Sequence, residues 1–116
     1  MSTQTNYYNF EKLDTYVGGN KEVKIKLIEI FHRTAPELLK SINDSYQKND
    51  LKNMSFFAHK LKSSIDIFNI NDLKTDIRNL EKFGKEEINL DKIPALLEKL
   101  NKIIPKVVEQ ISSEIK

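Results

Sequence analysis

The sequence has 116 residues, 39% of them hydrophobic and 31% charged, which predicts one soluble domain spanning 1–116. It has no cysteine, which excludes a disulfide scaffold, a thiolate zinc site and a cysteine nucleophile. Its 19 basic and 17 acidic residues are interleaved, whereas nucleic-acid binders usually carry a clustered basic stripe. No signal peptide and no apolar run of about 20 residues is visible, so we expect a cytoplasmic protein that binds neither nucleic acid nor a membrane.

A short helix is predicted close to the N-terminus. Residues 1–8 are polar apart from two tyrosines and are expected to be loosely held. Apolar residues then recur at helical spacing at Phe10, Leu13 and Val17. Gly18-Gly19 follows and is expected to end this helix.

A long second helix is predicted up to about residue 47. Asn20 is a good N-cap for it, and apolar residues follow at steps of three and four. Pro36 lies inside and is expected to kink the helix rather than end it, because the apolar stripe continues beyond it. Asn49-Asp50 is expected to end this helix and cap the next.

The third segment has the most regular pattern of the chain. Its apolar seam steps by three and four and predicts a helix packed in a bundle. The seam consists of Leu51, Met54, Ala58, Leu61, Ile65 and Phe68. Asn69 is expected to take the left-handed conformation after this helix, and Asn71 to cap the next one.

Two further amphipathic stripes complete the chain. The fourth helix has its stripe at Leu73, Ile77, Leu80 and Phe83, and Gly84 is expected to close it. The last helix starts near Ile93, with Pro94 in its first turn and Pro105 expected to bend it. The pattern predicts an all-α fold, an up-down-up-down antiparallel four-helix bundle with a short additional N-terminal helix.

His59 is the chemically most interesting position on the third helix. At about 100° per residue it lies about 100° from Ala58, off the apolar seam and toward solvent. Ser55, Lys62 and Ser63 lie on the same flank. A neutral imidazole is a nucleophile near pH 7 and can hold a phosphoryl group. Lys62 would neutralise its charge, and the small Ser63 would leave room for it.

Other candidate residues have simpler interpretations. His32 has Ala35 and Pro36 at the positions where a second metal ligand would stand, so we interpret it as a surface residue. Phe56 and Ile67 face away from the seam, and they either pack under the short first helix or border a docking patch around His59.

The run Ala58-His59-Lys60-Leu61-Lys62-Ser63-Ser64 resembles the signature of histidine-containing phosphotransfer domains, commonly Ala-His-x-Leu-Lys-Gly-Ser/Ala. The Leu80-Glu81 pair, Phe31 and the turn at Gly18-Gly19-Asn20 are also similar to that family, over roughly residues 10–85. The sequence departs from it at Ser63 and Asn69, where the family has glycines. Glycine after the lysine lets a partner approach closest in that family, so Ser63 is expected to affect transfer rate and partner fit.

The resemblance implies a phosphocarrier in a multistep phosphorelay. His59 would be phosphorylated on Nε2 by a receiver-domain aspartate and would pass the group to another receiver, with Lys62 as the matching positive residue. The partners would be receiver domains of a hybrid sensor histidine kinase and of a response regulator, with Mg²⁺ supplied by the receiver. The chain would be a monomer without a cofactor, kinase or ATP site of its own, free-standing or cut from a longer protein.

Two alternatives remain open at this point. A non-catalytic helical adaptor would bind receiver domains without phosphotransfer, and Ser63 in place of glycine favours it. The dimerisation domain of a histidine kinase would be a two-helix hairpin followed by an ATP-binding domain, which the four predicted helices do not match.

Overall fold

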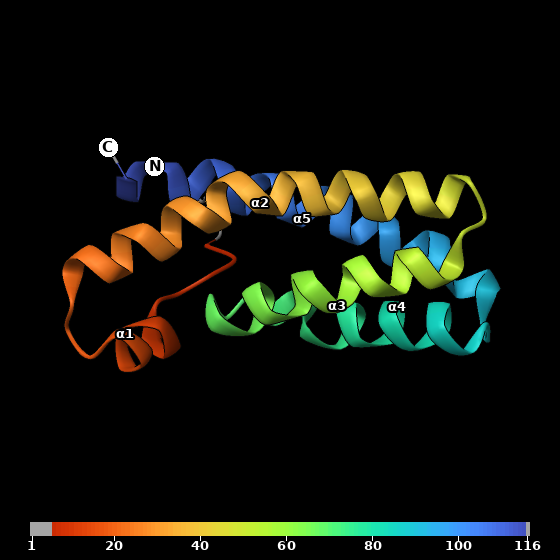
Figure 1. Cartoon of the computed structure of the whole chain (residues 1–116), viewed down its shortest axis with the longest axis horizontal. Coiled ribbons are helices and arrows are strands. Elements are labelled where there is room, and N and C mark those ends of the chain that lie inside the picture. The colour runs from red at the N-terminus through yellow and green to blue at the C-terminus, as the bar shows by residue number, and fades with distance from the viewer. Residues whose placement is uncertain (1–5, 116) are drawn as a thin grey trace.

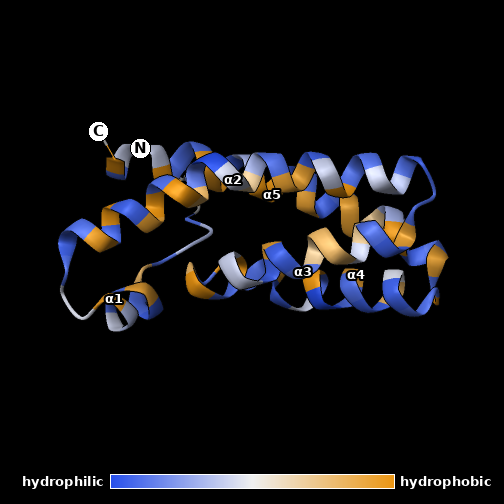
Figure 2. Ribbon diagram, in the orientation of Figure 1, coloured by the Kyte–Doolittle hydropathy of each residue, from blue (hydrophilic) through white to orange (hydrophobic). Residues whose placement is uncertain are grey.

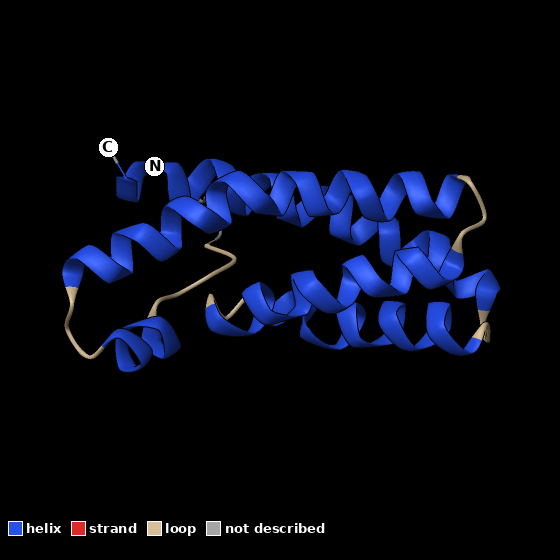
Figure 3. Ribbon diagram, viewed as in Figure 1, coloured by secondary structure: helices blue, strands red, loops and turns tan. Residues whose placement is uncertain are grey.

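The computed structural model describes residues 6–115, and these residues form helices and connecting turns with no strand (Figure 3). The α-helices are α1 (Glu11–Val17), α2 (Lys21–Gln47), α3 (Leu51–Ile67), α4 (Lys74–Glu86) and α5 (Ile93–Ile111). Single 3₁₀ turns precede α4 and α5 and follow α5, at Asn71–Leu73, Leu90–Lys92 and Ser112–Ile115.

The four long helices lie side by side in a molecule of 41 × 33 × 20 Å (Figure 1). The pairs in contact are α2–α3, α3–α4, α4–α5 and α2–α5. The short α1 lies at one end, where it contacts α2. Lys24 of α2 pairs with Asp14 of α1 at 2.7 Å.

One apolar core runs between the long helices, and their outer faces are mostly polar, shown in blue in Figure 2. The predicted seam of α3 is buried throughout, from Leu51 to Phe68. Because every long helix contributes such a stripe, burial of apolar surface is the main stabilising term of the fold.

The predicted helix boundaries are confirmed where side chains cap them. Asn20 Oδ1 accepts a hydrogen bond from the Val23 amide at 3.1 Å, and Asp50 Oδ1 accepts one from the Asn53 amide at 3.2 Å. Asn69 adopts the predicted left-handed conformation with φ 48°.

Two local predictions are wrong. Asn71 begins a 3₁₀ turn and caps no helix with its side chain, and α4 starts after Leu73 without a side-chain cap. Gly84 lies inside α4, which continues to Glu86 and ends at Glu87 in the left-handed conformation. A glycine can therefore mark a close contact between helices instead of a helix end.

The start of the chain differs in part from the expectation of loosely held residues. Residues 1–5 lie outside the described part of the chain. Tyr8, in contrast, is buried, and the Asn9 amide donates to the carbonyl oxygen of Phe68 at 3.1 Å. This segment is tied to the end of α3.

Candidate functional site

His59 lies on α3, off the apolar seam, and its side chain is 62% exposed. Its Nδ1 lies 2.8 Å from Oε2 of Glu81 on α4. Within residues 6–115, Glu81 is the hydrogen-bond partner of the ring, and Nε2 has none. The predicted exposure of His59 is confirmed.

Glu81 is held from two sides. Lys62, one helical turn beyond His59, donates from Nζ to Oε1 of Glu81 at 2.8 Å. Ser55, one turn before His59, donates from Oγ to the backbone carbonyl of Glu81 at 2.7 Å. A single residue of α4 therefore connects three consecutive turns of α3.

The pKa of Glu81 decides which nitrogen of His59 carries the proton. Partial burial would raise that pKa, but the hydrogen bonds from Lys62 and His59 outweigh burial and hold the pKa below its ordinary value. Glu81 is therefore a carboxylate at neutral pH and can only accept hydrogen bonds. In a neutral imidazole the proton then lies on Nδ1, and the lone pair of Nε2 faces solvent.

Gly84 allows α3 and α4 to approach closely enough for these contacts. A Cβ at this position would lie 2.8 Å from Cε of Met54 and 2.9 Å from the carbonyl oxygen of Leu51. A larger residue would have to displace backbone atoms of α3. The contact between Glu81 and His59 thus depends on a small residue one turn further along α4.

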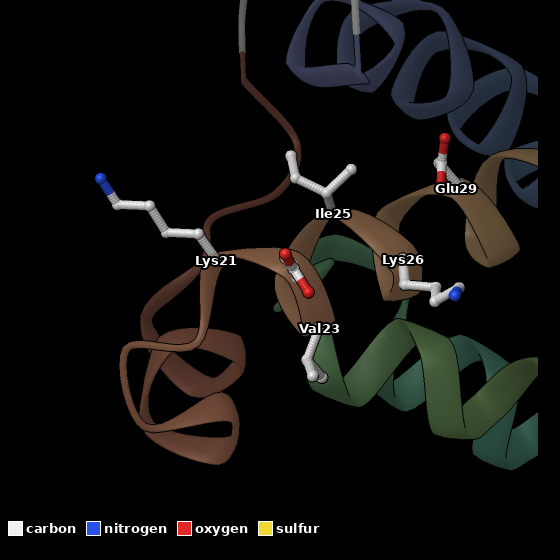
Figure 4. A pocket seen from close by; sticks show the side chains of 6 residues that line it. Lys21, Val23, Ile25, Lys26 and Glu29 are labelled. Atoms are coloured by element: carbon white, nitrogen blue, oxygen red, sulfur yellow. The ribbon is translucent and has the colours of Figure 1, made fainter.

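A cavity of about 360 Å³ opens beside His59 between α3 and α4. It is lined by Lys52, Ser55, Phe56, His59, Glu81 and Lys85. A larger hollow of about 550 Å³ lies at the start of α2, where Figure 4 shows Val23 and Ile25 pointing in opposite directions. Its lining contains no histidine, so the cavity beside His59 is the better candidate.

The predicted site residues occupy two different surroundings. Lys62 and His59 both contact the carboxylate of Glu81, and the ammonium group of Lys62 is therefore already paired. Ser63 is exposed and faces a second groove on the other side of α3. That groove is lined by Tyr16, Leu27, Ile30, Phe31, Ser63, Ser64, Ile67 and Phe68.

Phe56 and Ile67 separate into the two cases that the sequence left open. Phe56 is 52% exposed, packs its ring against Phe57 and lines the cavity beside His59. Ile67 is half-buried and lines the groove together with Tyr16 of α1. Phe56 therefore borders His59 and does not pack under the first helix, whereas Ile67 lies in the groove that Tyr16 of the first helix also lines.

His32 is half-buried on α2, not fully at the surface as expected. Across residues 6–115 there is no group of three or more His, Cys, Asp or Glu side chains that could hold a metal ion. In the same part of the chain, no helix is both long and apolar enough to cross a membrane.

The sequence did not indicate three residues of this site. Glu81 was noted only for its place in the family pattern, and Lys52 and Lys85 resembled ordinary surface lysines. The available signal was the spacing on each helix. Lys52, Ser55 and His59 share one face of α3, and Glu81 and Lys85 share one face of α4.

The model of the family described as "Hpt domain" matches residues 26–113. No curated protein and no solved structure matches the chain. The matched segment contains α3, α4 and the pair formed by His59 and Glu81. The chain is therefore a member of the Hpt domain family, the histidine phosphotransfer domains of phosphorelays.

Proposed function

We propose that this domain carries a phosphoryl group on Nε2 of His59, taken from the aspartyl phosphate of one receiver domain and passed to another. The observation that carries the proposal is the 2.8 Å contact between Nδ1 of His59 and the carboxylate of Glu81, together with the exposed opposite side of the ring. A proton fixed on Nδ1 leaves Nε2 as the nucleophile.

In the proposed step, the lone pair of Nε2 attacks the phosphorus atom of the aspartyl phosphate. The P–N bond forms while the P–O bond to the aspartate breaks, and the aspartate leaves as a carboxylate. The ring keeps its proton on Nδ1 and becomes positively charged. Glu81 would stabilise this charge, as a carboxylate stabilises the imidazolium of a catalytic triad. Transfer to the second receiver reverses the same bond changes.

We further propose that Mg²⁺ comes from the receiver domain, which would hold it next to the aspartate and offset phosphoryl charge. The domain would orient the imidazole of His59 through Glu81, which Lys62 and Ser55 hold in place. The exposed position of His59 on α3 would give the receiver access to it. It would have no kinase activity and act in the cytoplasm as a monomer in an up-down-up-down antiparallel bundle.

The receiver would cover the surface around His59. Phe56 lies exposed on one side of the histidine, and the apolar groove beside Ser63 lies on the other. Apolar surface flanking a polar centre is typical of a protein interface. The same surface would serve the receivers of a hybrid sensor kinase and of a response regulator in turn.

The test is phosphotransfer from a receiver domain charged with acetyl phosphate and Mg²⁺. The wild type and His32→Gln should both gain an acid-labile, base-stable label, whereas His59→Gln should gain none. Circular dichroism would verify that all three are folded. A wild type that stays unlabelled with a panel of charged receivers would contradict the proposal.

A non-catalytic adaptor is the second candidate, because Ser63 stands exposed at the edge of the groove where the family has glycine. It predicts receiver binding that persists in His59→Gln without transfer in the wild type. Faster transfer by Ser63→Gly than by the wild type would instead favour a carrier whose rate is limited by the approach of the receiver.

A further inference from the structure

The lysine expected to neutralise the phosphoryl group is already paired. Lys62 Nζ lies 2.8 Å from the carboxylate of Glu81, and its side chain is only 26% exposed. Two opposite charges at this distance largely cancel when seen from outside the pair. If the proposed function is correct, a phosphoryl group on Nε2 therefore needs positive charge from elsewhere.

The cavity beside His59 contains such charge. Lys52 of α3 and Lys85 of α4 both line it, and within residues 6–115 neither forms an ion pair. The only carboxylate in the lining is Glu81, whose charge Lys62 offsets. Two lysine charges remain, which matches the charge of about −1.5 to −2 on a phosphoryl group at pH 7.

The fold explains why two lysines from different helices meet here. Lys52 lies two turns before His59 on α3, and Lys85 lies one turn after Glu81 on α4. Gly84, next to Lys85, lets α4 approach α3 closely, since its missing side chain leaves room for Leu51 and Met54. The cavity is thus lined by the nucleophile and by two lysines, one from each helix.

We propose that this cavity is the phosphoryl-binding site of the domain and that Lys52 and Lys85 neutralise the phosphoryl group. Lys62 is then a positioning residue that holds Glu81 against Nδ1 of His59. This inference rests on the proposed function for its biological meaning, but the binding of a phosphoryl group at His59 can be measured without any receiver.

The experiment phosphorylates His59 chemically with potassium phosphoramidate in a His32→Gln background, where His59 is the only histidine. The pH titration of the phosphoryl group is then followed by its ³¹P chemical shift. A nearby positive charge favours the dianion and lowers the midpoint. Lys52→Gln and Lys85→Gln should each raise it by about half a pH unit, the size expected for one screened charge several ångströms away.

Lys82→Gln is the matched control, because it removes the same charge from the exposed surface of α4 next to Glu81 without touching the cavity. It should leave the midpoint unchanged. The double variant Lys62→Gln/Glu81→Gln removes the whole ion pair, whose two charges cancel, so it should move the midpoint less than either cavity variant. The inference is overturned if this double variant gives the largest shift, or if the cavity variants behave like Lys82→Gln.

The single variant Lys62→Gln has a readout of its own that a purely structural role would not move. Loss of the ammonium that holds Glu81 should change the ¹⁵N shifts of the His59 ring as the proton redistributes between its nitrogens. Failure of transfer from receivers, with the expected ³¹P midpoints, would reject the proposed function and leave the phosphoryl site standing. Normal transfer with unshifted midpoints would reject the site alone.

Discussion

The polar contacts across two of the helix interfaces, α2–α5 and α3–α4, differ in kind. Between α2 and α5, Asn43 and Asn101 exchange two hydrogen bonds, at 2.7 and 3.1 Å. Between α3 and α4, Glu81 accepts from His59 and Lys62. The amide pair satisfies itself, whereas the carboxylate leaves the far side of the imidazole open. The α2–α5 contact leaves no reactive atom exposed, whereas the α3–α4 contact leaves Nε2 of His59 free to react.

The difference predicts that removing the carboxylate affects transfer far more than removing the amide. Glu81→Ala should slow phosphotransfer roughly 10²-fold, because the proton is no longer fixed on Nδ1 and the ring charge is no longer offset. Asn43→Ala should leave the rate unchanged. Single-turnover transfer from one charged receiver measures both. Equal rates for Glu81→Ala and the wild type would remove the carboxylate from the mechanism.

The α3–α4 interface is also set apart by the close approach of its helices at Gly84, which a substitution there would test. Gly84→Ala places a Cβ within 3 Å of Met54 and of the Leu51 carbonyl. Even after the gain in helix propensity, the strain should lower the free energy of unfolding by about 1–2 kcal/mol. Urea denaturation measures it, with Lys82→Ala as an exposed control in the same helix. A more stable Gly84→Ala variant would mean that α3 and α4 can separate freely.

The amide pair should affect stability alone. Asn43→Ala and Asn101→Ala should each lower the free energy of unfolding by about 0.5–1 kcal/mol, a small value because both side chains are partly solvated. The double variant should cost less than the sum of the two, since each single change leaves the other amide without its partner across the interface. Strict additivity in this double-mutant cycle would show that the two amides do not interact energetically.

The smallest expected effect is on the pH dependence of stability, which should differ between the Glu81 contact and the Asn43–Asn101 contact. The folded-state pKa of Glu81 is lowered by its partners, so its carboxylate stabilises the folded state above the unfolded glutamate pKa, about 4.3. That contribution is lost as pH falls through the folded-state pKa. Glu81→Gln should therefore lose less stability than the wild type between neutral pH and pH 3, whereas Asn43→Ala should keep the wild-type slope. Parallel pH profiles for Glu81→Gln and the wild type would contradict this assignment.

Local patterns in the sequence determined much of the fold and part of the site. Caps such as Asn20 and Asp50 act on amides three residues away, and the seam from Leu51 to Phe68 follows helical periodicity, so both are visible along the chain. The exposure of His59 followed from the same periodicity. Gly84 misled the prediction because a helix end and a close helix contact both favour glycine.

Only the tertiary structure decided what surrounds His59. Glu81 is 22 positions away in sequence, and nothing local indicates that its carboxylate meets Nδ1 or that it occupies Lys62. The cavity with Lys52 and Lys85 likewise exists only because α3 and α4 approach at Gly84. Periodicity fixes the face of a helix on which a side chain lies, but its partners depend on how two helices are placed against each other.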